Sequence, residues 1–389
     1  MFLLGPGLFL PLEQEVSRAL AERRAQGVGG APVFRRAATI GIGLALGVLV
    51  ILIATSRLLV DKLFDGQLLL LVGLALGLVG ALGGHLTRGC LSGTSNFKAY
   101  GTYIGSDGLI RFLACAFVAM LGVKTAGWFG IAVGIAGILA VPVALKVQRP
   151  QLEPGPEAAW QEISRSLFYL MAGTLFAYAL MNLGPVLIKL LATEAETKKA
   201  GYFFSAVVVA RIPLFLFQAI QASLLPKLTE LASAGRLGDF RVGLRRLVAV
   251  VAVLAVVGTG VGYVLGPMVV KMMSGEDVVV EHRTMGLLAA GSGIYMLALA
   301  LAQAVIALGG HRRQAVGWFA GALALLLTTW LVSDDLYLRV EVGLLVGSLV
   351  AFVVMGYLLM RRLVLSGRGA LEVHAGDFIE ALHDVAIEP

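Results

Sequence analysis

The sequence predicts an all-α integral membrane protein, and three observations support that fold class. Hydrophobic residues make up 58% of the 389 residues, against about 45–50% in a typical soluble domain. Charged residues make up 14%, where about 25% is usual, and the mean hydropathy is +0.89. A soluble domain cannot bury that much apolar surface. Lipid solvates it, and forces each span to satisfy its own backbone hydrogen bonds as a helix.

Eleven segments of the chain approach the ~20 apolar residues that are needed to cross the hydrocarbon core. They lack the alternation of polar and apolar positions that marks the strands of a membrane barrel, so helices are expected throughout. We place them near residues 1–20, 37–56, 67–87, 100–122, 126–146, 164–190, 200–225, 247–270, 284–308, 314–333 and 341–360.

The distribution of basic residues predicts the orientation. If the loop between the first two helices is cytoplasmic, 20 of the 31 lysines and arginines lie on the cytoplasmic side. Basic residues concentrate on that side in membrane proteins. We therefore expect a multi-pass protein of the cell membrane whose carboxyl terminus is cytoplasmic. The same bias accounts for the net charge of +7 without a nucleic-acid partner.

An odd number of helices, with the first entering from outside, suggests that a twelfth helix belongs before the first. The chain then divides into an N-terminal lobe of five helices (1–146), a cytoplasmic linker (147–163), a C-terminal lobe of six helices (164–363) and a cytoplasmic tail (364–389). The linker is the least apolar stretch of the middle and carries Pro150, Pro154 and Pro156, which is typical of a connection between lobes.

An internal repeat supports two similar lobes. Leu10-Pro11 is echoed by Leu225-Pro226, and Arg35-Arg36 by Arg245-Arg246. The stretch 93–101 (GTSNFKAYG) matches 309–317 (GGHRRQAVG) at nearly the same offset. Glycines four residues apart, as at Gly43/Gly47, Gly73/Gly77 and Gly130/Gly134, are expected to pack helices within each lobe.

The sequence lacks the patterns of an enzyme. The two cysteines form no metal or disulfide pattern, and the five histidines, which we place at helix ends, loops or the tail, lack metal-ligand spacing. No nucleotide-binding fingerprint is present. We therefore expect no catalytic residues, no metal and no cofactor.

Charged residues inside the predicted helices are the candidate binding residues, because a lone charge at mid-bilayer usually faces a cavity. Arg211 lies midway along segment 200–225, and its neighbours one turn away are apolar. Its partner must be an acid from another helix, such as Glu13, or a ligand. A substrate contact, a structural ion pair and a lipid-facing position all remain open.

The other candidates are weaker. Arg111 has Asp107 one turn earlier, a spacing that favours an intrahelical ion pair. Glu13 lies near the cytoplasmic end of its helix, so it faces either the membrane interface or a cavity. Asn182, Gln218 and Gln221 are polar positions in long apolar helices, where cavity walls and interhelical hydrogen bonds are equally common.

Two stretches resemble a known family. Arg211, Pro213 and Leu225-Pro226-Lys227-Leu228, together with 88–101 (RGCLSGTSNFKAYG), look like the polysaccharide flippases of the multidrug/oligosaccharidyl-lipid/polysaccharide (MOP) exporter superfamily. The resemblance implies a MATE-like bundle of two six-helix lobes around a cavity that opens alternately to each side. It implies polyprenyl-pyrophosphate-linked oligosaccharide as the cargo, which Arg211 would attract. Partners would be membrane lipids and a glycan polymerase or glycosyltransferases.

Two other functions remain open. A drug/cation antiporter of the same fold would require a carboxylate in a membrane cavity, for which Glu13 and Glu15 are the candidates. A non-transporting scaffold of a glycan-assembly complex would need neither a buried carboxylate nor a cavity arginine.

Overall fold

The computed structural model describes residues 3–157, 160–193, 196–214, 217, 228, 231–232, 235–275 and 278–385. These residues form helices joined by short loops, with no strand among them. The helices group into two compact units, Met1–Leu191 (unit 1) and Ala192–Pro389 (unit 2). The all-α class is confirmed.

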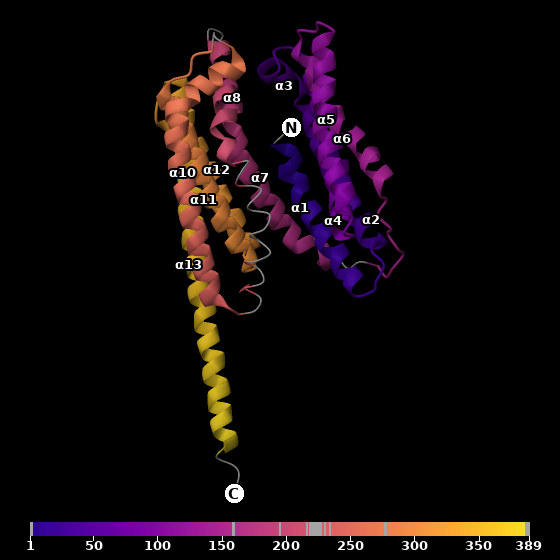
Figure 1. Ribbon diagram of the computed structural model, residues 1–389, viewed down its shortest axis with the longest axis vertical. Helices are drawn as coiled ribbons and strands as arrows, with labels where there is room; N and C mark the ends of the chain where they lie inside the picture. The colour runs from indigo at the N-terminus through magenta and orange to yellow at the C-terminus, as the bar shows by residue number, and fades with distance from the viewer. Residues whose placement is uncertain are drawn as a thin grey trace. The chain divides into compact units, whose positions relative to one another are not determined.

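Unit 1 contains seven of the described helices (Figure 1), namely α1 (Leu4–Ala25), α2 (Ala31–Ala54), α3 (Ser56–Leu63), α4 (Leu68–Gly93), α5 (Phe97–Met120), α6 (Ala126–Val147) and α7 (Trp160–Leu191). Helix α4 is central in the packing, because it contacts α1 on one side and α6 on another. Helix α5 packs on α6, and α1 also contacts α2 and α7.

The described helices of unit 2 are α8 (Thr197–Ala210), α10 (Leu237–Ser274), α11 (His282–Ala307), α12 (His311–Leu331) and α13 (Leu336–Val385). Helix α11 packs against α8, α10 and α13, and α12 packs mainly against α13. Helix α13 continues as one helix well beyond its apolar part, which ends at Leu363 (Figure 1).

Nine helices in the described ranges are long and apolar enough to cross a membrane. They coincide with nine of the eleven predicted segments. The other two segments correspond to α1, whose second half is rich in charge, and to α8. The apolar helical stretch that includes most of α8, Ala200–Leu214, is shorter than a membrane span. The short helix α3 between α2 and α4 was not expected.

The packing of α7 differs from the predicted lobe boundary. Segment 164–190 was assigned to the C-terminal lobe, yet α7 packs on α1 and belongs to unit 1. Leu167 of α7 belongs to the buried cluster around α1. At the other end of α7, Lys189 Nζ lies 2.7 Å from Oδ1 of Asp65, in the loop that follows α3. The division of the chain into two lobes of similar sequence, 1–146 and 164–363, is a separate matter and stays a prediction.

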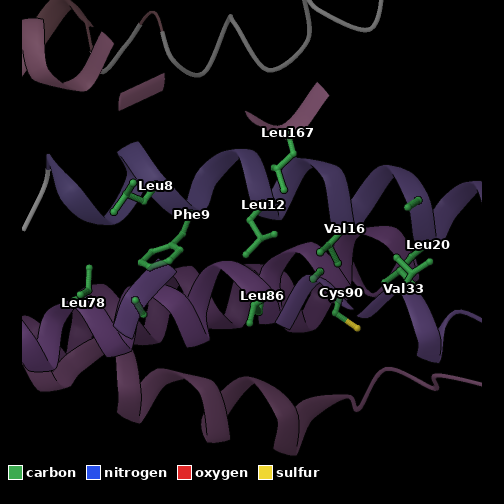
Figure 2. Packing of buried hydrophobic residues seen from close by; sticks show 13 residues of the cluster. Leu8, Phe9, Leu12, Val16, Leu20, Val33, Leu78, Leu86, Cys90 and Leu167 are labelled. Carbon is green, nitrogen blue, oxygen red and sulfur yellow. The ribbon is translucent and has the colours of Figure 1, made fainter. Parts of the chain in front are cut away.

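The core of unit 1 forms where one apolar stripe of α1 meets α4 (Figure 2). Phe9, Leu12 and Val16 follow one another at three- and four-residue spacing, which places them on one face of the helix, and all three are buried. Leu86 and Cys90 present the matching face of α4. Lipid is as apolar as these side chains, so close packing holds the helices together, not escape from water.

Glycines allow α4 and α6 to approach closely. A Cβ atom on Gly73 would lie 2.5 Å from the carbonyl carbon of Gly130, and one on Gly134 would collide with the backbone of Gly73. The packing role predicted for these glycines is confirmed. The same prediction is wrong for Gly43 and Gly47, because a Cβ there would meet nothing within 4 Å.

Candidate functional site

A cluster of polar side chains is built around Glu13, about halfway along α1. Its carboxylate is buried, with 8% of the side chain exposed. Oε2 lies 2.6 Å from a terminal guanidinium nitrogen of Arg88 and 2.8 Å from Nδ1 of His85, both on α4. The hydroxyl of Tyr100 on α5 donates a hydrogen bond of 3.2 Å to Oε1. We call Glu13, His85, Arg88 and Tyr100 the Glu13 cluster.

The cluster corrects two assignments made from sequence. His85 was placed at a helix end and Arg88 in a loop, because the apolar run of their segment stops near residue 87. Helix α4 in fact continues to Gly93, so both side chains project from its interior. Their three-residue spacing puts them on one face, opposite Glu13.

The carboxylate of Glu13 is buried against α4, and its position at the membrane interface or in a cavity stays a prediction. The neighbouring Glu15 behaves as its sequence spacing suggested, because Oε1 pairs with Arg18 on the same helix at 2.6 Å.

His85 gives the cluster two proton arrangements. Its Nδ1 lies 2.8 Å from Glu13 and 2.7 Å from Arg88. A ring nitrogen that carries hydrogen donates to the carboxylate, and one without hydrogen accepts from the guanidinium, but it cannot do both. Loss of either partner would therefore change which hydrogen bond Nδ1 of His85 makes.

Tyr103 on α5 connects the Glu13 cluster to a second charge pair. Its ring lies under the guanidinium of Arg88, with 5.7 Å from Cζ to the ring centroid, which favours a cation–π contact. Its hydroxyl packs directly on the bare Cα of Gly84. Any side chain at Gly84 would displace this ring.

The second pair is Asp107 with Arg111, one turn apart on α5, at 2.9 Å. The intrahelical ion pair predicted from their spacing is confirmed. Each side chain is about a quarter exposed. Both also face the pocket described next, so the ion-pair and cavity interpretations hold together.

A pocket of about 310 Å³ opens beside these groups in unit 1. Its polar lining comes from α4, α5 and α7, and the remaining lining is small or apolar. The lining residues are Gly5, Pro6, Leu10, Gly80, Ala81, His85, Arg88, Tyr103, Asp107, Arg111, Gly137 and Tyr178. Glu13 lies behind this wall, in contact with His85 and Arg88.

Asn182 lies outside the lining of the pocket. Its side-chain amide donates a hydrogen bond of 2.9 Å to the carbonyl oxygen of Tyr178, one turn earlier on α7. Tyr178 lines the pocket and Asn182 does not. This hydrogen bond lies within α7, so it is not the interhelical bond that the sequence left open as the alternative to a cavity wall.

Arg211 lies in unit 2 at a break in the helix, where α8 ends at Ala210. Pro213 contributes to the break, because it has no N–H to donate to the carbonyl of Val209. Tyr295 on α11 interacts electrostatically with Arg211. The pairing of Arg211 with Glu13 stays a prediction. Gln218 and Gln221 lie outside the described residues.

Comparison with solved structures identifies the fold. An inward-facing multidrug resistance MATE family transporter of the MOP superfamily superimposes with a TM-score of 0.72, covering 94% of this chain and 89% of that one. The chain has the MATE fold. Sequence identity to this structure is 13%. The bent form of the Vibrio cholerae MATE transporter VcmN gives a TM-score of 0.62 at 15% identity, over 93% and 87% of the two chains.

Sequence comparison adds two relatives of the MATE-fold chain. They are uncharacterized proteins of Mycobacterium tuberculosis, from strains CDC 1551 / Oshkosh and ATCC 25618 / H37Rv. Each is 28% identical over 332 residues, which are 80% of this chain and 72% of the relative. No protein-family model matches the sequence.

Proposed function

We propose that the chain is a membrane transporter that moves polyprenyl-pyrophosphate-linked oligosaccharide across the cell membrane by alternating access. The observation that carries the proposal is the pocket of unit 1, which places two arginines, Arg88 and Arg111, within membrane-spanning helices. Ionisable groups within membrane-spanning segments are expensive and mark substrate or ion pathways. The MATE fold supports a transporter as the class of protein.

The two arginines suit a pyrophosphate. A guanidinium has five N–H donors in a planar fork and binds phosphate oxygens through charge-assisted hydrogen bonds. In the structure Arg88 is paired with Glu13 and Arg111 with Asp107. These carboxylates make the buried cations tolerable. A phosphate would compete with these carboxylates for the guanidinium donors. Because the carboxylates neutralise the arginines again when the phosphate dissociates, release of the cargo does not expose unpaired charges.

The other lining groups suit a saccharide. Asp107 accepts hydrogen bonds from sugar hydroxyls, and Tyr103 and Tyr178 both donate and accept. Pockets for apolar small molecules are lined mainly by hydrophobic side chains with few polar groups, whereas six of the twelve residues that line this pocket carry a polar or charged group. Pockets for small ligands measure about 300–1,000 Å³, so about 310 Å³ accommodates the charged head and leaves the distal sugars outside.

The direct test replaces Arg111 in the full chain. Arg111→Gln removes the charge and keeps most of the packing, and we expect glycan export to fall about 10- to 100-fold, since a hydrogen bond to a charged group contributes about 1.5–3 kcal/mol. Arg111→Lys should retain part of the activity. Arg236→Gln is the matched control at an exposed arginine that pairs with Asp239 three residues later. Normal export by Arg111→Gln at equal protein level in the membrane would refute the role of the pocket.

Arg211 provides an independent test in unit 2. We expect Arg211→Ala to abolish export and to leave membrane insertion intact, because the apolar helix around it becomes easier to insert without the charge. A variant that inserts normally and exports normally would remove Arg211 from the cargo path.

A second function, drug/cation antiport, is favoured by one observation, the buried carboxylate of Glu13. If the cargo is a cationic drug, Glu13→Gln should abolish drug resistance and leave glycan export unchanged. A scaffold would give a third pattern, in which Arg111→Gln, Arg211→Ala and Glu13→Gln all leave export unchanged while removal of the whole protein abolishes it. A glycan polymerase and glycosyltransferases are proposed as partners, because they would supply or consume the proposed glycan cargo.

A further inference from the structure

Glu341 occupies a core position of α13 in unit 2. The buried face of this helix repeats every three or four residues through Leu344, Ser348, Ala351, Met355, Leu359 and Leu363. Glu341 falls on the same face one turn before Leu344, and none of its surface is exposed. A carboxyl group therefore stands where the helical pattern calls for an apolar side chain.

Neither carboxyl oxygen of Glu341 has a hydrogen-bond partner among the residues that the structure describes. The hydroxyl of Thr284 on α11 is close enough to act on the carboxyl. It is itself buried and makes no hydrogen bond of acceptable geometry. On α12, the hydroxyl of Thr329 donates to the carbonyl of Leu325 in its own helix, at 2.8 Å.

The charged groups that act on Glu341 come from the ends of α11 and α13. Arg283 is the basic one, and it is half exposed and 3.7 Å from Glu281. Glu281 and Asp335 are acidic and exposed. Tyr337, one turn earlier on α13, also interacts with Glu341. One exposed cation therefore faces two acids besides Glu341, and no residue in the described part of unit 2 forms an ion pair with the buried carboxyl.

We propose that Glu341 is a proton-binding site, in which the carboxyl carries a bound proton while α11 and α13 are packed together around it. A carboxylate buried without a partner takes up a proton in preference to remaining charged. The proton comes from water, binds one carboxyl oxygen and makes the side chain neutral. It returns to water when the carboxyl becomes hydrated and ionises.

The position of the site gives the proton a structural consequence. Glu341 lies a little more than one turn from the start of α13, and Thr284 lies within the first turn of α11. Ionisation at this point would favour separation of the two helix ends, because water would then solvate the carboxylate. The packing of α11 on α13 should therefore tighten at low pH and loosen at high pH, whatever the cargo.

The first experiment measures the protonation state directly. The full-length protein and two variants, Glu341→Gln and the control Asp239→Asn at an exposed acid of α10, are purified at pH 7, and their infrared spectra are compared. We expect the carbonyl band of a protonated carboxylic acid in the wild type and in Asp239→Asn, and its loss in Glu341→Gln. Identical intensity of that band in all three proteins would overturn the proposal.

The second experiment measures thermal unfolding of the same proteins between pH 6 and pH 9. Gln resembles the neutral acid in shape and charge, and the carboxyl of the unfolded chain is ionised throughout this range, so Glu341→Gln should exceed the wild type in stability by a margin that grows as the pH rises from 6. The control Asp239→Asn, at an exposed acid of α10, should follow the wild type. A Glu341→Gln variant that fails to fold, or that is less stable by the same amount at every pH, contradicts a neutral carboxyl. Stabilisation of the wild type alone by sodium ions would show a metal cation in place of the proton.

Discussion

Glu13 illustrates at the scale of the residue how a charge is accommodated inside a bundle of apolar helices. Its Oε2 is shared by Arg88 and His85, and its Oε1 accepts from Tyr100. The charge is thus paired and hydrogen-bonded by side chains of two other helices, which is the condition under which buried ions persist.

Removal of one partner should cost more than removal of both. Arg88→Met leaves the carboxylate of Glu13 buried without its main counter-ion, so we expect a loss of about 3–5 kcal/mol in the free energy of unfolding. In Glu13→Gln/Arg88→Met no unpaired charge remains, and stability should recover in part. Unfolding of the purified protein in detergent measures the coupling. Additive effects of the two substitutions would show that the 2.6 Å contact contributes no net stability.

Residue by residue, the sequence revealed only half of this site. Glu13, Asp107 and Arg111 stand out because a charge interrupts an apolar run, and Arg111 pairs as its spacing required. His85 and Arg88 were missed because they follow the apolar run, where a helix and a cytoplasmic loop have the same composition. The signal available was their three-residue spacing, which has meaning only once Glu13 is known to face them.

At the scale of the element, the length of the apolar runs predicted the helices well but their ends poorly. Segment 247–270 lies inside α10, which starts at Leu237 and runs to Ser274. A helix that leaves the membrane keeps its backbone hydrogen bonds while its side chains become polar, so composition marks the lipid boundary and not the helix end. In segment 200–225, α8 ends at Ala210, two residues before Ile212-Pro213, and most of the segment after Leu214 lies outside the described residues.

The contact between α4 and α6 predicts opposite effects for two similar substitutions. Gly134→Ala places a methyl group against the backbone of Gly73 and within 3.2 Å of the amide nitrogen of Gly77, so the helices must separate. We expect a loss of about 1–3 kcal/mol, as for other overpacked cores. The thermal unfolding midpoint of the purified protein measures it.

Gly47→Ala is the matched control, because a Cβ there meets nothing within 4 Å. Alanine favours a helix over glycine by about 1 kcal/mol, so this variant should be as stable as the wild type or slightly more so. Equal destabilisation by both substitutions would show that the glycines act through backbone flexibility and not through close packing.

For the whole molecule, the sequence predicted an all-α membrane protein of the MATE fold, and the structure and the solved MATE structures agree. The placement of α7 was not predictable, because the proline-rich linker marks where the chain leaves one helix and contains no information on which helix the next one packs against. The contact with α1 depends on side chains such as Leu167, far away in the sequence.

The orientation of the molecule in the membrane is a prediction that labelling can check. In a background with Cys90→Ala and Cys115→Ala, Lys62→Cys should react with a membrane-impermeant maleimide in intact cells. Lys98→Cys should react only after permeabilisation, because the bias in basic residues places it on the cytoplasmic side. Both lysines are exposed, so burial does not explain a difference. The reverse pattern would invert the topology.

The most direct measurement of the account is transport by the purified protein in lipid vesicles. A fluorescent polyprenyl-pyrophosphate-linked oligosaccharide is placed in both leaflets, and a membrane-impermeant quencher reports the molecules that reach the outer one. We predict that the wild type transfers the probe from the inner leaflet many-fold faster than empty vesicles and that Arg236→Gln does the same. Arg111→Gln should transfer it 10- to 100-fold more slowly than the wild type. Transfer at the rate of empty vesicles by the folded wild type, or equal rates for Arg111→Gln and the wild type, would contradict it.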